Sequence, residues 1–316
     1  MTPQAAGPRP AAVELERLSR RFGERVAVDG LSFSVARGEL FGIVGPDGAG
    51  KTTTLRMLAG VLRPSGGDAR LNGISVAREP ERVKQAIAYM SQRFGLYGDL
   101  TVRENLEFYA DLYRVPRAAR PARFERLHQF SNLGAFQDRL AGRLSGGMKQ
   151  KLALSCCLVH EPEILLLDEP TFGVDPVSRR DLWLIVHGMV AHGTTAVVST
   201  AYMDEAERFD RLALLDRGRI VALGPAEELQ KSLAVEVLAV EVERVREARV
   251  AALALPEVRG AAVFGERLHV TVVSAGRDAP RVEAGLRAAG FAVTAARAIV
   301  PSLEDVFIER ITAAAR

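Results

Sequence analysis

The sequence of 316 residues contains very little cysteine and no long hydrophobic run. Its two cysteines, Cys156 and Cys157, are adjacent. Neighbouring helical residues point about 100° apart, so we expect reduced thiols rather than a disulfide or a metal site. No apolar stretch approaches the roughly 18 residues of a membrane-spanning helix, which excludes one. Residues 1–12 are rich in Pro, Ala and Arg and lack the apolar segment of a secretory signal, so we expect a disordered tail and a cytoplasmic protein.

Lysine and net charge are also low. Only five of the 42 basic residues are lysine, and the formal net charge is +3. That charge is too small to indicate nucleic acid or an anionic membrane as a partner, and no basic face with interleaved aromatic residues appears. Hydrophobic residues make up 48% and charged residues 26%, which is typical of a globular protein long enough for one large and one smaller domain.

What the sequence does contain is a complete phosphate-loop motif, G-x-x-x-x-G-K-[ST], at residues 45–52. Its glycines let the backbone turn N–H groups toward phosphate oxygens. A predicted strand over 39–44 precedes it and a helix follows, whose N-terminus favours anions. The motif therefore predicts a nucleoside triphosphate site, with Lys51 on the β- and γ-phosphates and the Thr52 hydroxyl on Mg²⁺. The predicted nucleotide contacts from this segment are Gly45, Pro46, Asp47, Gly48, Ala49, Gly50, Lys51, Thr52 and Thr53.

A second pair of motifs lies further along the chain. The sequence LSGGM occupies residues 144–148, and an apolar strand over 164–168 ends in Asp168 and Glu169. Two carboxylates at a strand end can be simply solvated. Beside a phosphate loop, however, Asp168 is placed to hold Mg²⁺ and Glu169 to orient or deprotonate water.

These motifs together resemble those of the ATP-binding-cassette (ABC) ATPases, and the resemblance covers essentially the whole chain after the N-terminal tail. It implies that Phe22 stacks on adenine, although an aromatic residue there can also be ordinary core. It places Val28 among the nucleotide contacts. It also implies that Gln92 touches Mg²⁺ and the attacking water, and that the loop after Gln92, residues 93–97, contacts a membrane permease. Core packing remains the alternative for that loop.

The resemblance also implies a dimer. In this family the signature segment binds the γ-phosphate in a partner subunit's site, so two subunits enclose two ATP molecules. Asp175, in the loop over 173–176, matches the family's loop at the dimer interface. The signature residues carried over in this way are Ser145, Gly146, Gly147 and Gln150.

One position departs from the family pattern. After the predicted strand over 195–200 the family has a histidine that contacts the γ-phosphate, whereas this sequence has Ala201. A methyl group neither donates a hydrogen bond nor carries charge, so we expect slow hydrolysis with Glu169 still intact. The substitution is either natural, in an asymmetric pair, or engineered. The Tyr202 hydroxyl is a possible substitute, although its neighbouring position directs the side chain elsewhere.

The motifs divide the chain into two predicted domains. Residues 13–231 are assigned to an α/β P-loop ABC ATPase with a mostly parallel sheet, an antiparallel β edge and a helical subdomain at about 90–160. We expect a turn at 28–31 in the β edge. Thr101 followed by Glu104 predicts a capping box at a helix start.

Residues 232–316 carry no catalytic spacing. Alternating strands and helices over this segment, with helices at 244–255 and 280–289, predict a βαββαβ order and a small α+β ferredoxin-like domain. Residues 301–307 resemble the C-terminal extension of bacterial drug-resistance exporters, which indicates an accessory or regulatory role. The predicted strands are 234–242, 259–264, 267–273 and 291–298.

The family resemblance leads to one functional hypothesis with two alternatives. The chain is predicted to be the ATP-hydrolysing subunit of an ABC-2 type drug exporter, using ATP and Mg²⁺, forming a homodimer or heterodimer, and bound to the inner membrane through a separate permease. A soluble ABC ATPase without a membrane partner is one alternative. A nucleotide-binding scaffold with little turnover is the other.

Overall fold

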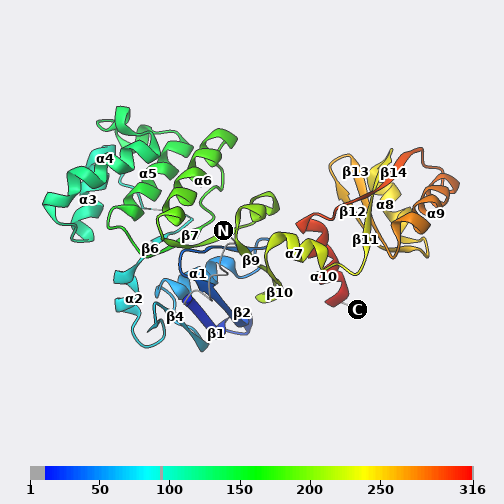
Figure 1. Cartoon of the computed structure of the whole chain (residues 1–316), viewed down its shortest axis with the longest axis horizontal. Helices are drawn as coiled ribbons and strands as arrows, with labels where there is room; N and C mark the ends of the chain where they lie inside the picture. The colour runs from blue at the N-terminus through cyan, green and yellow to red at the C-terminus, as the bar shows by residue number, and fades with distance from the viewer. Residues whose placement is uncertain (1–10, 93–94, 315–316) are drawn as a thin grey trace, which may run out of the picture. The chain divides into compact units, whose positions relative to one another are not determined.

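The computed structural model describes residues 11–92 and 95–314, which divide into two compact units, Met1–Ile220 and Val221–Arg316 (Figure 1). Residues 1–10 of the predicted tail lie outside the described residues, as do the first two residues of the predicted loop 93–97. The first strand already begins at Ala11. The domain boundary expected at 231 stays a prediction.

A six-stranded sheet forms the centre of the first unit, and its edge strand, Arg219–Gly224, runs past the end of that unit at Ile220. The four neighbouring pairs from β9 to β6 are all parallel, in agreement with the mostly parallel sheet predicted above. Every residue of β3, β7 and β8 is buried, which explains why these strands are continuous apolar runs rather than alternating ones. In spatial order the strands are β10 (Arg219–Gly224), β9 (Arg211–Asp216), β3 (Leu40–Val44), β8 (Thr195–Thr200), β7 (Ile164–Asp168) and β6 (Ile87–Met90).

An antiparallel sheet accompanies it, in the order β2 (Arg25–Ala36), β1 (Ala11–Phe22), β4 (Gly66–Leu71) and β5 (Ile74–Ser75). The chain reverses after Phe22, which pairs with Arg25, so the turn predicted at 28–31 is wrong. That segment lies inside β2, where Gly30 has φ +69° beside a register shift. The glycine that made this segment look like a turn instead belongs to a β-bulge within the strand.

One hydrophobic core joins the two sheets. The Phe33 and Phe41 rings stack with centroids 4.9 Å apart, linking β2 to β3. Helix α1 (Lys51–Leu58) starts directly after the phosphate loop and buries Leu55, Met57 and Leu58 in this core. Packing of α1 between the sheets thus fixes the position of the phosphate loop.

A helical region follows in the chain and appears at the upper left of Figure 1. The predicted capping box is confirmed: the Glu104 N–H donates to Thr101 Oγ1 (3.2 Å) and the Thr101 N–H to Glu104 Oε2 (2.7 Å). Burial raises the pKa of both Cys156 and Cys157, which keeps them as thiols. The elements here are α3 (Val102–Leu112), η1 (Arg117–Ala119), α4 (Arg120–Ser131), η2 (Gly134–Phe136), η3 (Ala141–Arg143), α5 (Gly146–Leu158) and α6 (Pro176–Ala191). Helix α2 (Pro80–Ala86) lies apart from them, at the lower left of Figure 1.

The second unit is built on an antiparallel sheet in the order β12–β13–β11–β14. Helix α9 begins at Ala275 rather than at 280, because the Asp278 carboxylate accepts the Ser274 N–H (3.1 Å) and starts the helix one turn before Pro280.

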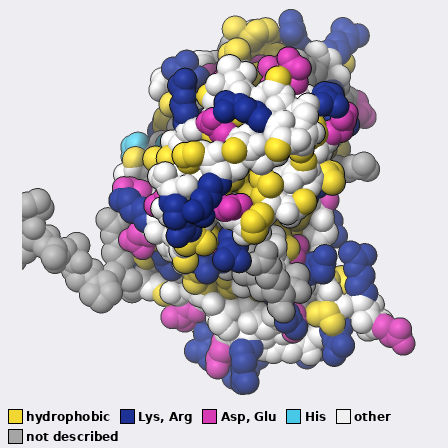
Figure 2. Space-filling view, turned by 90° about the vertical axis from the view of Figure 1, so that its right-hand side faces the viewer, with side chains coloured by type: hydrophobic (Ala, Val, Ile, Leu, Met, Phe, Trp, Pro, Cys, Tyr) yellow, Lys and Arg dark blue, Asp and Glu magenta, His cyan; other side chains and the backbone are white. Residues whose placement is uncertain are grey.

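Acidic and basic side chains are interspersed on the face shown in Figure 2. The elements are α7 (Ala226–Lys231), β11 (Glu236–Val242), α8 (Val245–Leu253), β12 (Val258–Phe264), β13 (Arg267–Val272), α9 (Ala275–Ala288), β14 (Val293–Ile299) and α10 (Leu303–Ala314). Across residues 11–92 and 95–314, no helix is long and apolar enough to cross a membrane.

A buried polar contact holds the start of α10 against this sheet. Asp305 Oδ1 lies 2.9 Å from His269 Nδ1 on β13, and Asp305 Oδ2 accepts the Ser302 N–H at 2.8 Å. Burial by itself would raise the pKa of Asp305, but the hydrogen bonds from His269 and Ser302 outweigh it and hold that pKa below its usual value. The contact therefore stabilises the protein at neutral pH, and this contribution is lost as the pH falls through the lowered pKa.

Asp305→Asn is expected to lower the local opening free energy of α10 by about 1–3 kcal/mol, because a buried charge-assisted contact is lost. Hydrogen exchange of the α10 amides at pH 7 measures this. Glu304→Gln, which removes the exposed neighbouring carboxylate, is the matched control. Equal exchange in both variants would contradict the assignment of the stabilisation to Asp305.

Candidate active site

The phosphate loop lies between the end of β3 and the start of α1. Its close contacts explain two of its glycines. A Cβ at Gly45 would lie 2.3 Å from the Leu215 carbonyl oxygen, and one at Gly50, where φ is +103°, would lie 2.6 Å from the Ala27 carbonyl oxygen. The loop thus follows a path open only to glycine at these positions, with α1 beginning at Lys51.

Lys51 is buried at 4% exposure, and its Nζ contacts three residues of the predicted site, Gly45, Pro46 and Glu169. Its Nζ donates to the carbonyl oxygens of Gly45 (2.8 Å) and Pro46 (3.1 Å) and lies 3.1 Å from Glu169 Oε1. The ammonium group is therefore surrounded by oxygen atoms. Phosphate oxygens can replace them as hydrogen-bond acceptors.

Glu169 follows β7 with an unusual backbone. Its φ is +48°, and its N–H lies 3.1 Å from both the carbonyl oxygen and the Oγ of Ser199. Its other carboxylate oxygen, Oε2, accepts a hydrogen bond from Gln92 Nε2 at 2.9 Å. Contacts with β8 thus hold a left-handed conformation that aims this carboxylate between Lys51 and Gln92.

The predicted Mg²⁺ donors also come together. Thr52 Oγ1 donates to Asp168 Oδ1 at 3.0 Å, and the Ser199 hydroxyl donates to the same oxygen at 2.7 Å. A hydroxyl and a carboxylate are the hard oxygen donors that Mg²⁺ prefers, and the glycine cradle beside them leaves backbone room for phosphate. These residues therefore fit Mg²⁺ bound together with a phosphate chain.

Tyr89 completes the surroundings of Asp168. Its hydroxyl lies 3.4 Å from Asp168 Oδ2. Burial, together with the negative charge of Asp168, raises the pKa of Tyr89 to about 12. The phenol therefore stays protonated at neutral pH and donates toward the carboxylate.

Lys51, Thr52, Gln92 and Glu169 line a cavity of about 360 Å³, whereas Asp168 contacts Thr52 without itself lining the cavity. Phe22 is at its edge, 47% exposed, with the Arg20 guanidinium 4.6 Å above its ring. Val28 is fully buried and does not line the cavity, whereas its neighbour Ala27 does. The lining residues are Phe22, Arg25, Ala27, Asp47, Gly48, Ala49, Gly50, Lys51, Thr52, Thr53, Gln92 and Glu169.

The signature residues are not among those lining this cavity. Ser145 caps α5, where its Oγ accepts the Met148 N–H at 3.3 Å. A Cβ at Gly147 would lie 2.1 Å from Ser178 Oγ, so α5 packs closely against the start of α6 there. Asp175 caps α6 by accepting the Ser178 N–H. Gln150 lines a second groove of about 310 Å³, which shares Gln92 with the first cavity. The role of these residues in a partner's site stays a prediction.

Ala201 immediately follows β8 and does not line the cavity. The Tyr202 ring is covered by the Arg179 guanidinium, which lies 4.4 Å from its centroid. The cavity lining includes no histidine within the described part of the chain, so the position expected to carry the family's imidazole offers only a methyl group.

Four residues at the site were missed in the sequence. Tyr89 and Ser199 both contact Asp168, and Arg25 and Ala27 line the cavity. Tyr89 lies three positions before Gln92, and Ser199 lies on the strand before Ala201, so each was adjacent to a recognised motif. No local sequence motif marks Arg25 and Ala27 as site residues, because only the antiparallel β1–β2 pairing brings them to the phosphate loop.

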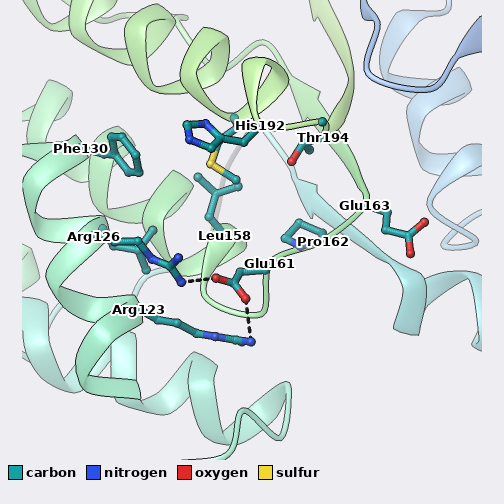
Figure 3. A pocket seen from close by; sticks show the side chains of 12 residues that line it. Arg123, Arg126, Phe130, Leu158, Glu161, Pro162, Glu163, His192 and Thr194 are labelled. Atoms are coloured by element: carbon teal, nitrogen blue, oxygen red, sulfur yellow. Dashed lines mark hydrogen bonds and ion pairs between the residues drawn. The ribbon is translucent and has the colours of Figure 1, made fainter. Parts of the chain in front are cut away.

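A second cavity, also about 360 Å³, lies between α4, the end of α5 and the end of α6 (Figure 3). Leu158 and Phe130 are among its apolar lining residues. Glu161 forms ion pairs with both Arg123 and Arg126, so two guanidinium groups share one carboxylate at the rim. None of the predicted site residues lines it.

The sheet, the glycine loop and the paired oxygen donors define a P-loop nucleotide-binding protein. A family model described as ABC transporter matches residues 28–172. The daunorubicin/doxorubicin resistance ATP-binding protein DrrA of Streptomyces peucetius is 39% identical over 278 residues, 88% of this chain and 83% of that protein. The chain therefore belongs to the ABC transporter ATP-binding proteins.

Two further comparisons agree with this assignment. The probable multidrug ABC transporter ATP-binding protein YbhF of Escherichia coli (strain K12) is 47% identical over 226 residues, 71% of this chain but only 39% of that protein. A solved structure of an ATP binding subunit of an ABC transporter matches with a TM-score of 0.64 and 30% identity, over 70% of this chain and 92% of that one. The P-loop ABC ATPase fold with its mixed sheet is confirmed.

Proposed function

We propose that this chain is the ATP-hydrolysing subunit of an exporter of drug-like molecules, working on a separate membrane permease. The observation that carries the proposal is the meeting of Lys51, Glu169 and Gln92 in one cavity beside the Thr52–Asp168 pair. A nucleotide bound in this cavity would contact the Lys51 ammonium group, the Glu169 carboxylate as base, and the Mg²⁺ donors Thr52 and Asp168.

In the proposed mechanism, Lys51 exchanges its carbonyl and Glu169 partners for phosphate oxygens when ATP binds. Thr52 and Asp168 would hold Mg²⁺, which when bound would neutralise charge on the phosphates. Glu169, freed from Lys51 but still bonded to Gln92, accepts the proton of the attacking water. Gln92 orients that carboxylate and, by family resemblance, relays the state of the site to the permease.

Hydrolysis in this proposal is slow, because no imidazole stands beside the γ-phosphate at Ala201. Loss of one transition-state hydrogen bond typically costs about 10²–10³ in rate. The nucleotide-bound dimer would therefore persist longer than in a protein with histidine at this position.

The proposed assembly is a homodimer or heterodimer in which Ser145, Gly146 and Gly147 complete the partner's site. It sits at the cytoplasmic face of the membrane through a permease of the ABC-2 type that contacts the loop after Gln92. The name of the relative DrrA, a daunorubicin/doxorubicin resistance ATP-binding protein, supports drug-like molecules as the class of cargo. The strand order of the second unit supports a ferredoxin-like accessory domain at 232–316 that stabilises or regulates the dimer.

Lys51→Ala tests the nucleotide site directly. It is expected to weaken Mg·ATP binding by about 10- to 100-fold, because charge-assisted hydrogen bonds to phosphate are lost. Calorimetric titration measures this, with the exposed Lys84→Ala on α2 as the control. Unchanged affinity in Lys51→Ala would overturn the assigned site.

Co-purification from membranes separates the exporter from its alternatives. Recovery of the chain with an integral membrane protein supports the exporter. Active ATPase without any such partner favours a soluble ABC ATPase, and binding without turnover favours a scaffold.

A further inference from the structure

A buried carboxylate lies directly behind the Ala201 position. Glu205, 1% exposed, belongs to the 3-10 helix η4 (Met203–Arg208). Its Oε2 accepts the Thr200 hydroxyl at 2.7 Å, and its Oε1 accepts the Trp183 indole N–H at 3.1 Å. Trp183 and Thr200 are each 1% exposed, so all three polar groups are satisfied within the protein interior.

Thr200 connects this cluster to the phosphate loop. Its carbonyl oxygen accepts the Gly45 N–H at 3.2 Å, and its hydroxyl oxygen accepts the Tyr202 N–H at 3.0 Å. The backbone around Ala201 is thus held by Thr200 on both sides. The Thr200 hydroxyl in turn donates to Glu205. Gly45 and Glu205 are therefore connected through Thr200 alone, by one hydrogen bond to its carbonyl oxygen and one from its hydroxyl.

Helix α6 lies on the other side of Glu205. Arg179 and Trp183 are four residues apart and so share a face of α6, below Asp175 at its N-terminus. Arg179 Nε is 3.7 Å from Glu205 Oε1. The opposite contacts of α6 are with α5, where Lys151 pairs with Asp181. Helix α6 therefore contacts both the signature helix and the turn that carries Ala201.

We propose that Glu205 is a positioning residue that ties the turn at Ala201 to α6, so that nucleotide bound at the phosphate loop alters the surroundings of Trp183. The inference rests on the proposed nucleotide site but adds a mechanical connection to it. Because the carboxylate accepts from both Thr200 and Trp183, a shift of the phosphate loop at Gly45 reaches the indole through it. Removing the carboxylate leaves two buried donors unpaired and breaks the connection.

The chain provides its own probe, because Trp183 is its single tryptophan. In the full chain, Mg²⁺ with a non-hydrolysable ATP analogue is expected to change the Trp183 emission, with the same midpoint as calorimetric binding. Glu205→Ala is expected to abolish this change while nucleotide affinity stays within about twofold, and Glu205→Gln to restore much of it, since an amide oxygen still accepts the indole N–H. Glu207→Ala, an exposed carboxylate on the same turn, is the matched control and keeps the full change.

The outcomes separate this inference from the function on which it rests. Persistence of the emission change in Glu205→Ala, or its absence in the unaltered chain despite measured binding, overturns the coupling alone. Absence of nucleotide binding overturns the proposed function. If melting shows that Glu205→Ala does not fold, Thr200→Val supplies the test: it keeps the Glu205–Trp183 bond but removes the hydroxyl, and it is expected to lose the emission change.

Discussion

Glu169→Gln is expected to lower the kcat of Mg·ATP hydrolysis by about 10²–10⁴-fold, the range for a lost general base. Glutamine keeps the size of the side chain and can still pair with Gln92, but it cannot take the proton of water. Steady-state phosphate release measures the loss. Because Glu169 has φ +48°, the variant must also be checked for folding, and an unbranched glutamine suits that backbone better than a β-branched residue.

Nucleotide affinity is the second readout for this variant. ATP should bind at least as tightly as in the unaltered chain, because the positive charge of Lys51 then has no carboxylate competitor. Glu266→Gln, in the exposed turn between β12 and β13, is the control for removal of one carboxylate. A kcat within about twofold of the unaltered chain would assign the base to another group.

Ala201→His is expected to raise kcat by about 10²–10³-fold with little change in KM. The position directly follows β8, whose last residue accepts the Gly45 N–H, so an imidazole there begins beside the phosphate loop. A ring that donates to the γ-phosphate acts on charge that develops during the reaction, which is why the effect belongs in kcat rather than in binding.

The control is Ala201→Phe, a ring of similar size without a donor. A rise with histidine but not with phenylalanine would identify the hydrogen bond as the missing contribution. If neither variant changes the rate, hydrolysis is limited elsewhere, and the reading of this chain as a scaffold or as the weak half of an asymmetric pair gains support.

The parts of the fold that were predicted are those with local signals. The phosphate loop, the buried strand before it and the Thr101–Glu104 cap each depend on residues close in sequence. The turn misplaced at 28–31 shows the limit of such signals. Gly30 there serves a register shift inside β2, and only the pairing with β1 distinguishes a bulge from a chain reversal.

The site residues also divide into those marked by a local motif and those brought together by contacts between distant segments. Lys51, Asp168 and Glu169 could be predicted as site residues because their motifs fix both residue type and spacing, and the structure places Lys51 beside Glu169 and Thr52 beside Asp168. The contributions of Tyr89 and Ser199 depend on β6, β7 and β8 lying side by side, a relation between distant segments. The Glu205–Trp183 bond could not be predicted either, since neither residue belongs to a phosphate motif and the contact spans α6 and η4.

The ion pair between Lys51 and Glu169 makes substrate binding an exchange reaction. Because Lys51 pairs with the carboxylate proposed as the base, a phosphate chain that binds Lys51 must displace that carboxylate. The affinity for ATP would then include the cost of separating the two charges. In the proposed mechanism the arriving phosphate also frees Glu169 to accept a proton, so nucleotide binding and activation of the base are one step.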